Sequence, residues 1–161
     1  MGGMALVRIL VDGFSLLHSW PELAPGRPRH TAAVRKELIN RLTQYHDACG
    51  TPITIVFDGA AAKLEIEETP SKPGLEILYS RAGQTADQII ERAAYRLKAF
   101  GEVLVVTNDL AERETVTSLG ALASNCENFI RTVENDLADL ERELRAYNQK
   151  EQTKFRTSKD L

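Results

Sequence analysis

Three short runs of apolar residues most strongly constrain how this chain folds. They cover Leu6–Val11, Ile53–Phe57 and Val103–Val106, and they are rich in valine and isoleucine. Because the runs are almost continuously apolar, they are typical of strands covered on both faces, as in a parallel sheet. Leu75–Tyr79 alternates between apolar and polar residues and predicts a strand nearer an edge. Ala121–Ala123 predicts a very short fifth strand.

Two helices are predicted between these strands. Thr31 is placed to cap the first helix, which Gly50 and Pro52 end. Thr85 is placed to cap the second, which finishes just before Gly101. In both segments the apolar residues recur at helical spacing, so each helix has one face for packing on the sheet.

Two further helices complete the pattern. A short one is predicted after Asp109, with Glu112 in capping-box position, and the longest is predicted to start at Ser124, with Glu127 three residues on. Strands that alternate with helices imply crossover connections, so the predicted fold class is α/β, a three-layer α/β/α sandwich with a mainly parallel central sheet. The longest helix carries an apolar packing stripe made of Ile130, Val133, Leu137, Leu140, Leu144 and Tyr147.

The 161 residues fit one domain over residues 1–149, followed by a polar tail over 150–161 that we expect to be disordered. No apolar stretch approaches the roughly 20 residues of a membrane span, and the N-terminus lacks the pattern of a secretory signal. Cys49 and Cys126 form no CxxC-type pair, and we expect both to be reduced thiols. These features predict a cytoplasmic protein that binds no membrane.

Five acidic residues fall where one edge of the predicted sheet should lie. Asp12 ends the first strand, Asp58 follows the second, and Asp109 follows the fourth. Asp87 lies in the first turn of the helix that follows the third strand, and Glu91 is one turn further along the same helical face. Ligands of open α/β sheets bind at the carboxyl ends of the strands, so these carboxylates are expected to approach one rim.

Each of these acids also has an ordinary structural explanation, as a helix cap or a turn residue. Together they are harder to explain this way, because two carboxylates about 5 Å apart repel by roughly 3 kcal/mol at an effective dielectric near 20. Oxygen ligands without histidine or cysteine favour Mg²⁺ or Mn²⁺. Such ions assist phosphodiester hydrolysis, and the sequence lacks the glycine-rich loops that bind nucleoside triphosphates or dinucleotides.

The composition supports the same interpretation. Twenty basic and twenty-three acidic residues give a formal net charge of −3, which argues against a basic nucleic-acid-binding surface. Bound divalent ions would reverse the local charge at the acidic rim. We therefore interpret the excess of acids as a requirement for metal.

Four motifs in this order resemble those of the YacP-like NYN domains, bacterial relatives of the PIN-domain nucleases. The motifs are residues 11–17 (VDGFSLL), 56–59 (VFDG), 85–91 (TADQIIE) and 106–109 (VTND), and the resemblance spans about residues 5–147. It implies a PIN-like fold, Mg²⁺- or Mn²⁺-dependent endoribonuclease activity on RNA, and the ribosome as a partner.

The resemblance also implies roles for individual residues. Asp12, Asp87 and Asp109 match the central metal-binding acids, and Asp58 and Glu91 match further acidic positions. Ser15 stands where the family usually has asparagine, which removes one amide donor and affects substrate positioning. The residues that we expect to contact the substrate are Ser15, Arg81, Thr107 and Asn108.

Basic and aromatic side chains near the rim are candidates for holding RNA. Trp20 could stack on a base or be structural. His18 could face the site, although a lone histidine is more often structural. The arginines and the histidine of the flanking segments could instead be ordinary surface charges. They are Arg27, Arg29, His30, Arg81 and Arg113.

Two other functions are left open by the sequence. The first is a non-catalytic RNA- or ribosome-binding protein with the same fold, which Ser15 favours and the full set of acids opposes. The second is a receiver-like domain phosphorylated on Asp58, which is disfavoured because receivers carry a lysine directly after the fifth strand and none lies directly after residues 121–124. The RNA cleaved, the choice between RNA and DNA, the number of metal ions and the oligomeric state are not determined by the sequence.

Overall fold

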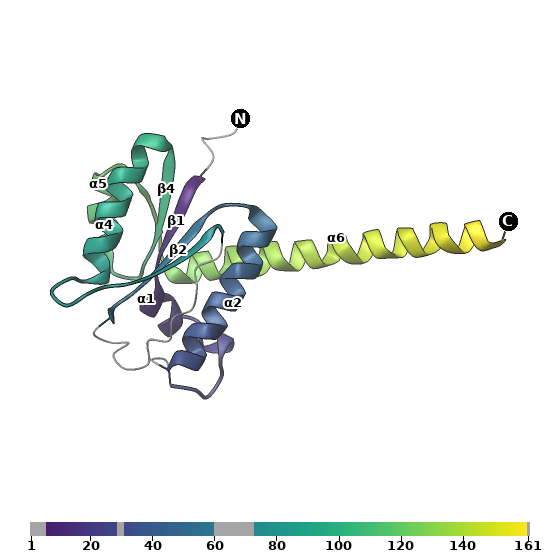
Figure 1. Cartoon of the computed structure of the whole chain (residues 1–161), viewed down its shortest axis with the longest axis horizontal. Helices are drawn as coiled ribbons and strands as arrows, with labels where there is room; N and C mark the ends of the chain where they lie inside the picture. Colours follow the sequence, from purple (N-terminus) through teal and green to yellow (C-terminus); the bar gives the residue numbers. More distant parts are fainter. Residues whose placement is uncertain (1–5, 29–30, 60–72, 161) are drawn as a thin grey trace.

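The central sheet has five parallel strands in the order β3-β2-β1-β4-β5 (Figure 1). The computed structural model describes residues 6–28, 31–59 and 73–160. All five predicted strands are confirmed, and β3 lies at an edge as the alternation of its residues indicated. The strands are β1 (Leu6–Asp12), β2 (Ile53–Phe57), β3 (Leu75–Tyr79), β4 (Glu102–Val106) and β5 (Leu122–Ser124).

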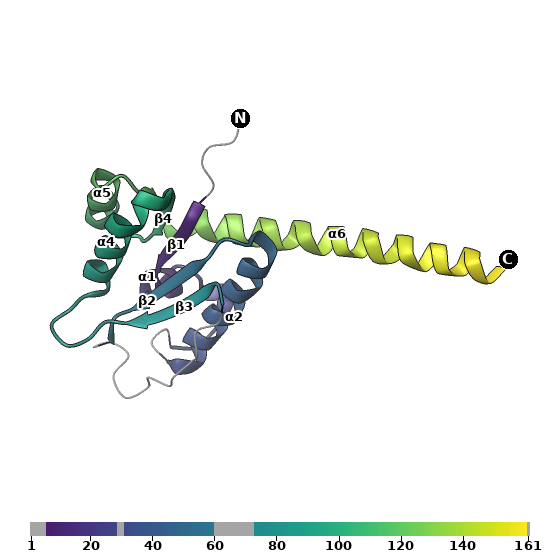
Figure 2. The ribbon, with the colours of Figure 1, turned by 45° about the horizontal axis from the view of Figure 1, so that its top comes forward.

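Helices cover both faces of the sheet, so the predicted three-layer α/β/α sandwich is confirmed (Figures 1 and 2). The helices α1 (Gly13–His18), α2 (Ala32–Cys49) and the start of α6 (Cys126–Asp160) pack on one face. The helices α4 (Ala86–Leu97) and α5 (Leu110–Ser118) pack on the other. Two short 3₁₀ helices, η1 (Pro21–Leu23) and η3 (Lys98–Phe100), complete the described elements.

Local sequence signals account for most helix boundaries. The Thr31 side chain accepts a hydrogen bond from the amide of Val34, and Gly50 ends α2 in the left-handed conformation with φ of 76°. Thr85 and Gln88 form a reciprocal capping box at the start of α4. These boundaries agree with the sequence prediction.

Helix α6 differs from the prediction at its start. Ser124 belongs to β5, and Asn125 supplies the cap instead, because its Oδ1 accepts a hydrogen bond of 2.8 Å from the amide of Asn128. Asparagine and serine are comparably good capping residues, so sequence alone did not distinguish these neighbouring positions. Helix α1 was not predicted, because only six residues separate the end of β1 from Ser19.

The prediction of a disordered tail from residue 150 is wrong for residues 150–160, which continue α6 as a helix. No glycine or proline occurs after Gly120, so nothing in this stretch interrupts the helix. Ion pairs along the helix join Arg142 to Asp139, Arg145 to Glu141 and Lys154 to Glu151. Such pairs each add a few tenths of a kcal/mol to helix stability.

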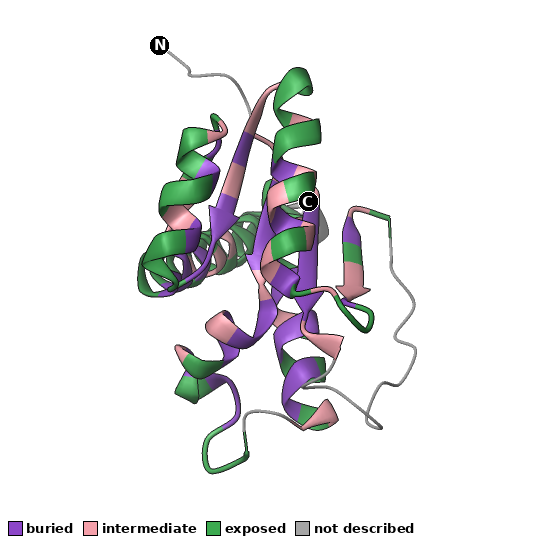
Figure 3. Cartoon of the chain, turned by 90° about the vertical axis from the view of Figure 1, so that its left-hand side faces the viewer, coloured by how far each residue is buried: buried purple, intermediate pink, exposed green. Residues whose placement is uncertain are grey.

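The core lies on both faces of the sheet, and β2 is buried along its whole length (Figure 3). Trp20 is also buried, being 1% exposed, and its indole Nε1 donates a hydrogen bond of 3.1 Å to Oε1 of Glu134 on α6. Cys126 is buried and Cys49 exposed, and both are free thiols. Within the described residues, no helix combines the length and apolarity needed to cross a membrane.

Candidate functional site

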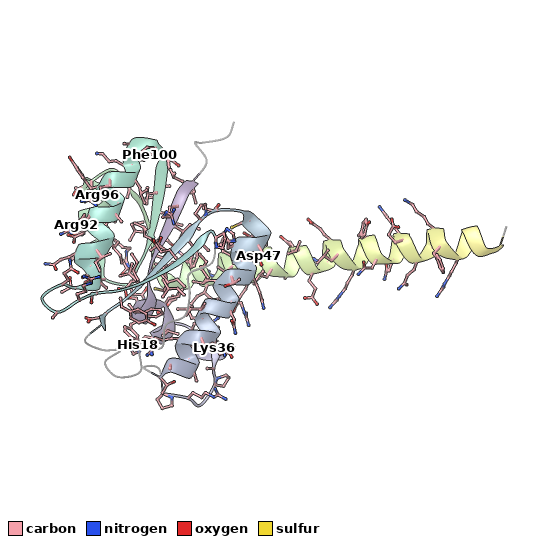
Figure 4. All side chains as sticks on the ribbon, viewed as in Figure 1. His18, Lys36, Asp47, Arg92, Arg96 and Phe100 are labelled. Atoms are coloured by element: carbon pink, nitrogen blue, oxygen red, sulfur yellow. The ribbon has the colours of Figure 1, made fainter. Side chains whose placement is uncertain are left out.

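The predicted acidic residues lie at the carboxyl ends of the strands. Asp12 is the last residue of β1, Asp58 follows β2, and Asp109 lies three residues beyond β4. Asp87 is in the first turn of α4, which follows β3. His18, at the end of α1, is at this same end of the sheet (Figure 4).

Asp12 is held by its own neighbours. One carboxylate oxygen accepts a hydrogen bond of 3.3 Å from the amide of Ser15, so Asp12 caps α1. The other oxygen accepts a hydrogen bond of 3.3 Å from the hydroxyl of Thr107. Burial raises the pKa of Asp12, the hydrogen bonds from Ser15 and Thr107 lower it, and the charge of Asp109 raises it further. Burial dominates, so this carboxylate is one that a cation would stabilise.

Asp87 shows most directly that the acids converge. Its pKa is raised first by burial and then by the charges of other carboxylates, and these are Asp12, Asp109, Glu91 and Asp58 in decreasing order of effect. All five predicted acids are therefore close enough to interact electrostatically, although they come from four separate segments of the chain. A bound cation would favour the charged form of each of these carboxylates.

Glu112 belongs to the same cluster and was predicted only as part of a helix cap. It is 4% exposed, and its Oε1 has no hydrogen-bond partner within the described part of the chain. Burial, a hydrogen bond to Glu91, and the charges of Asp87, Glu91 and Asp109 together raise the pKa of Glu112 to about 9. Asp109 caps α5 through its Oδ1, which accepts from the amides of Ala111 and Glu112. Glu112 points toward the cluster of acids rather than back to the cap.

The segment after β4 is fixed to the rest of the site by side-chain hydrogen bonds. Asn108 donates from Nδ2 to the hydroxyl of Ser19 at 2.6 Å and accepts at Oδ1 from the amide of Cys126 at 2.8 Å. The amide of Asn108 donates to the hydroxyl of Ser15 at 3.4 Å. Ser15 thus connects α1 to the loop that carries Asp109. The side-chain amide of Asn108 is therefore hydrogen-bonded within the protein at both its nitrogen and its oxygen. Thr107 is fully buried, so its side chain is not exposed for the predicted contact with a substrate.

A cavity of about 440 Å³ lies beside these acids. It is large enough for part of a nucleotide and is hollowed between the end of α1 and the start of α4. Its lining combines three carboxylates with a histidine and hydroxyl groups. The lining residues are Asp12, Phe14, Ser15, His18, Asp58, Thr85, Ala86 and Asp87.

The glycines that follow Asp12 and Asp58 are required for close packing. A Cβ atom on Gly13 would overlap the ring of Phe57, and one on Gly59 would overlap the carbonyl oxygen of Ser80. The Ser80 hydroxyl also accepts from the amide of Gly59 at 2.9 Å and donates to Asp58 at 3.5 Å. Because glycine has no side chain, the backbone next to Asp12 packs closely against Phe57, and the backbone next to Asp58 packs closely against Ser80.

Replacing Gly13 with alanine is expected to destabilise the protein by about 1–3 kcal/mol. The Phe57 ring that it would meet is packed between Phe14, with ring centroids 5.2 Å apart, and Tyr79, at 5.5 Å. Helix propensity alone predicts the opposite sign, since alanine is favoured over glycine in helices by about 1 kcal/mol. Equilibrium unfolding in guanidinium chloride measures the difference, and a stabilised variant would refute the packing argument.

The remaining basic and aromatic candidates have mixed outcomes. Of the two alternatives for Trp20, base stacking is wrong, because the ring is buried and Arg41 lies 5.7 Å from its centroid. The Arg113 guanidinium donates to the carbonyl of Thr107 at 2.9 Å, so it braces the loop. Arg81 is exposed between β3 and α4, and Arg27 is exposed after η1. Arg29 and His30 lie outside the described residues.

The ligand atoms that this cluster offers are of the kind that a hard divalent cation such as Mg²⁺ prefers. The donors are carboxylate oxygens, and burial together with their mutual repulsion raises the pKa of Asp87. Among residues 6–28, 31–59 and 73–160, no three carboxylate, imidazole or thiol groups are arranged as a ready-made metal cage. Mg²⁺ is commonly held by one or two carboxylates with several waters, so a closed cage is not required.

The fold and the acidic site together define a nuclease-type α/β/α protein, and comparison with known proteins identifies the family. The sequence profile of the YacP-like NYN domain matches residues 9–160. The chain therefore belongs to the YacP-like NYN domain family, as its four motifs predicted.

Individual relatives agree with this assignment. The chain is 28% identical over 138 residues to the uncharacterized protein YacP of Bacillus subtilis (strain 168), covering 85% of this chain and 81% of that protein. The crystal structure of Rae1 (YacP) from Bacillus subtilis matches with a TM-score of 0.77 at 26% identity, covering 98% of this chain and 90% of that one. A mutant of Rae1 matches with a TM-score of 0.75 at 25% identity, over 89% and 85% of the two chains.

Proposed function

We propose that this protein is a Mg²⁺- or Mn²⁺-dependent endoribonuclease that hydrolyses RNA phosphodiester bonds. The observation that carries the proposal is that the charges of four other carboxylates act on Asp87, which lines a cavity at the carboxyl ends of the strands. Family membership supports RNA as the substrate class. The proposal includes mRNA on the ribosome as a substrate, which follows only from the family resemblance.

The proposed roles follow from position. Asp12, Asp87 and Asp109 hold the metal, and Asp58 and Glu91 orient water or metal-bound ligands around it. When bound, the metal supplies a more acidic water for attack and positive charge for the phosphate oxygens.

Other residues position this machinery. Thr107 and the amide of Ser15 fix the orientation of the Asp12 carboxylate. Arg81, exposed ahead of α4, is placed to contact an RNA phosphate.

Substituting Asp12 or Asp109 with asparagine is expected to remove Mn²⁺-dependent RNA cleavage. Each change keeps the shape of the side chain but removes its negative charge and replaces one ligating oxygen by an NH₂ group. Cleavage is measured with a labelled single-stranded RNA and with mRNA on purified ribosomes, each with Mn²⁺, with Mg²⁺ and with EDTA.

The matched control is Asp47→Asn. Asp47 is an exposed acid near the end of α2, away from the cluster, so its loss changes the net charge equally. This variant is expected to cleave as the wild type does. Full cleavage by both Asp12→Asn and Asp109→Asn would refute the mechanism, and Mn²⁺ binding without cleavage of any RNA would favour a non-catalytic RNA-binding protein.

A further inference from the structure

Helix α6 extends well beyond the sheet and the other helices (Figures 1 and 2). Its first turns are anchored in the core, where Phe129, Ile130 and Val133 are buried. From residue 141 to residue 156 every side chain is exposed. Because an isolated helix of this length is only marginally stable in water, the projecting part is expected to pack against another surface.

The projecting part keeps an apolar stripe on one side. Leu144, Tyr147 and Phe155 are 52%, 60% and 62% exposed. They continue the face of Leu137 and Leu140, since residues three, four and eleven positions apart lie on the same side of an α-helix. The 3–4–3 spacing from Leu137 to Tyr147 is typical of a helix that pairs with a second helix.

Charge is divided unequally along the same segment. Residues 134–143 hold five acids and one arginine, whereas residues 144–156 hold four bases and one glutamate. If two copies of the helix paired in parallel, acid would lie against acid and base against base. An antiparallel pair places the acidic half of each helix against the basic half of the other.

We propose that α6 pairs with α6 of a second copy of this chain, antiparallel, through the stripe centred on Leu144 and Tyr147. An RNA lying along the whole stripe is disfavoured because residues 134–143 would repel its phosphates, although residues 144–156 are basic. The paired helices would bury the exposed apolar side chains and hold two acidic sites at opposite ends of the dimer. The proposal does not depend on the proposed nuclease activity.

Oligomeric state tests this pairing directly. Sedimentation equilibrium of the full chain is expected to show a dimer at micromolar concentration, weakened when NaCl is raised from 0.1 to 0.5 M. The double variant Leu144→Glu/Tyr147→Glu is expected to raise the dimer dissociation constant at least about 100-fold, equivalent to roughly 2.7 kcal/mol.

The matched control is Ala146→Glu, which adds a charge to the same turn on the opposite side of the helix and should leave the dimer largely intact. Circular dichroism confirms that each variant remains folded. A wild-type chain that stays monomeric up to about 100 µM overturns the proposal. So does a control variant that dissociates as fully as the double variant.

The orientation is tested by distance. A spin label on Arg156→Cys, in a chain with Cys49→Ser, leaves buried Cys126 as the other thiol. An antiparallel pair centred between Leu144 and Tyr147 separates the two labels by roughly 30 Å, from the helical rise of 1.5 Å per residue. Labels within about 15 Å of each other would show a parallel pair and overturn the antiparallel arrangement.

Discussion

Replacing Asp87 with asparagine is expected to stabilise the metal-free protein while removing its activity. Asp87 is the acid on which the other four predicted carboxylates act, and all of them raise its pKa. Removing its charge relieves repulsion of about 1 kcal/mol after allowance for solvent screening. Cleavage of RNA is expected to fall at least about 100-fold, because metal contributes several kcal/mol of transition-state stabilisation.

Two measurements made together check this prediction. Unfolding in EDTA gives the stability of the metal-free protein, and the change in melting temperature on adding Mn²⁺ reports binding. A ligand at 100 times its dissociation constant stabilises the wild type by about 2.7 kcal/mol, and this gain should be lost in Asp87→Asn. Glu37→Gln, which removes an exposed acid from α2, should leave both quantities unchanged.

A destabilised Asp87→Asn variant in EDTA would contradict the electrostatic argument. An unchanged response to Mn²⁺ would instead show that Asp87 is not a metal ligand. The two outcomes are separable, because the first concerns repulsion within the folded protein and the second concerns the ligand.

The architecture was predictable because each strand is short, apolar and followed by a distinct polar signal. Ile53–Phe57 is apolar except for one threonine, and every residue of β2 is buried. The acids were predictable for the same reason, since parallel strands bring their carboxyl ends to one edge. Asp12 and Asp58 therefore needed no knowledge of side-chain packing.

The residues that were missed depend on contacts between distant segments. Glu112 is a good candidate for a helix cap in sequence, and only the packing of α5 against α4 brings it to Glu91. Trp20 is a plausible RNA contact in sequence, but Glu134, which is 114 residues away, accepts its indole hydrogen. Local spacing contains no signal for either pairing.

The length of α6 was missed for a different reason. Residues 150–160 are polar, and polarity without a packing face is typical of disorder as well as of an exposed helix. Charge pairs such as Lys154 with Glu151 favour the helix, but each contributes too little to decide between the two states. Phe155 is the one large apolar side chain of residues 150–160, and it would be buried only in the helix pairing proposed above.

The stability of the metal-free protein is expected to fall as pH rises, through Glu112. Its pKa is raised from 4.5 to about 9 in the folded protein, chiefly by burial and by the hydrogen bond to Glu91. Below about pH 4.5 the carboxyl is protonated in both states and its contribution to stability is fully present. As pH rises toward about 9 the unfolded chain ionises while the folded protein keeps the proton, so stability is progressively lost.

The expected loss is a few kcal/mol between pH 5 and pH 9, since each unit of difference in pKa corresponds to about 1.4 kcal/mol. Guanidinium chloride unfolding in EDTA measures it at each pH. Glu112→Gln keeps the shape of the group without a titrating proton, so its stability should depend much less on pH. Glu114→Gln, an exposed acid on the same helix, should retain the wild-type slope. A wild-type slope in Glu112→Gln would place the raised pKa on another acid of the cluster.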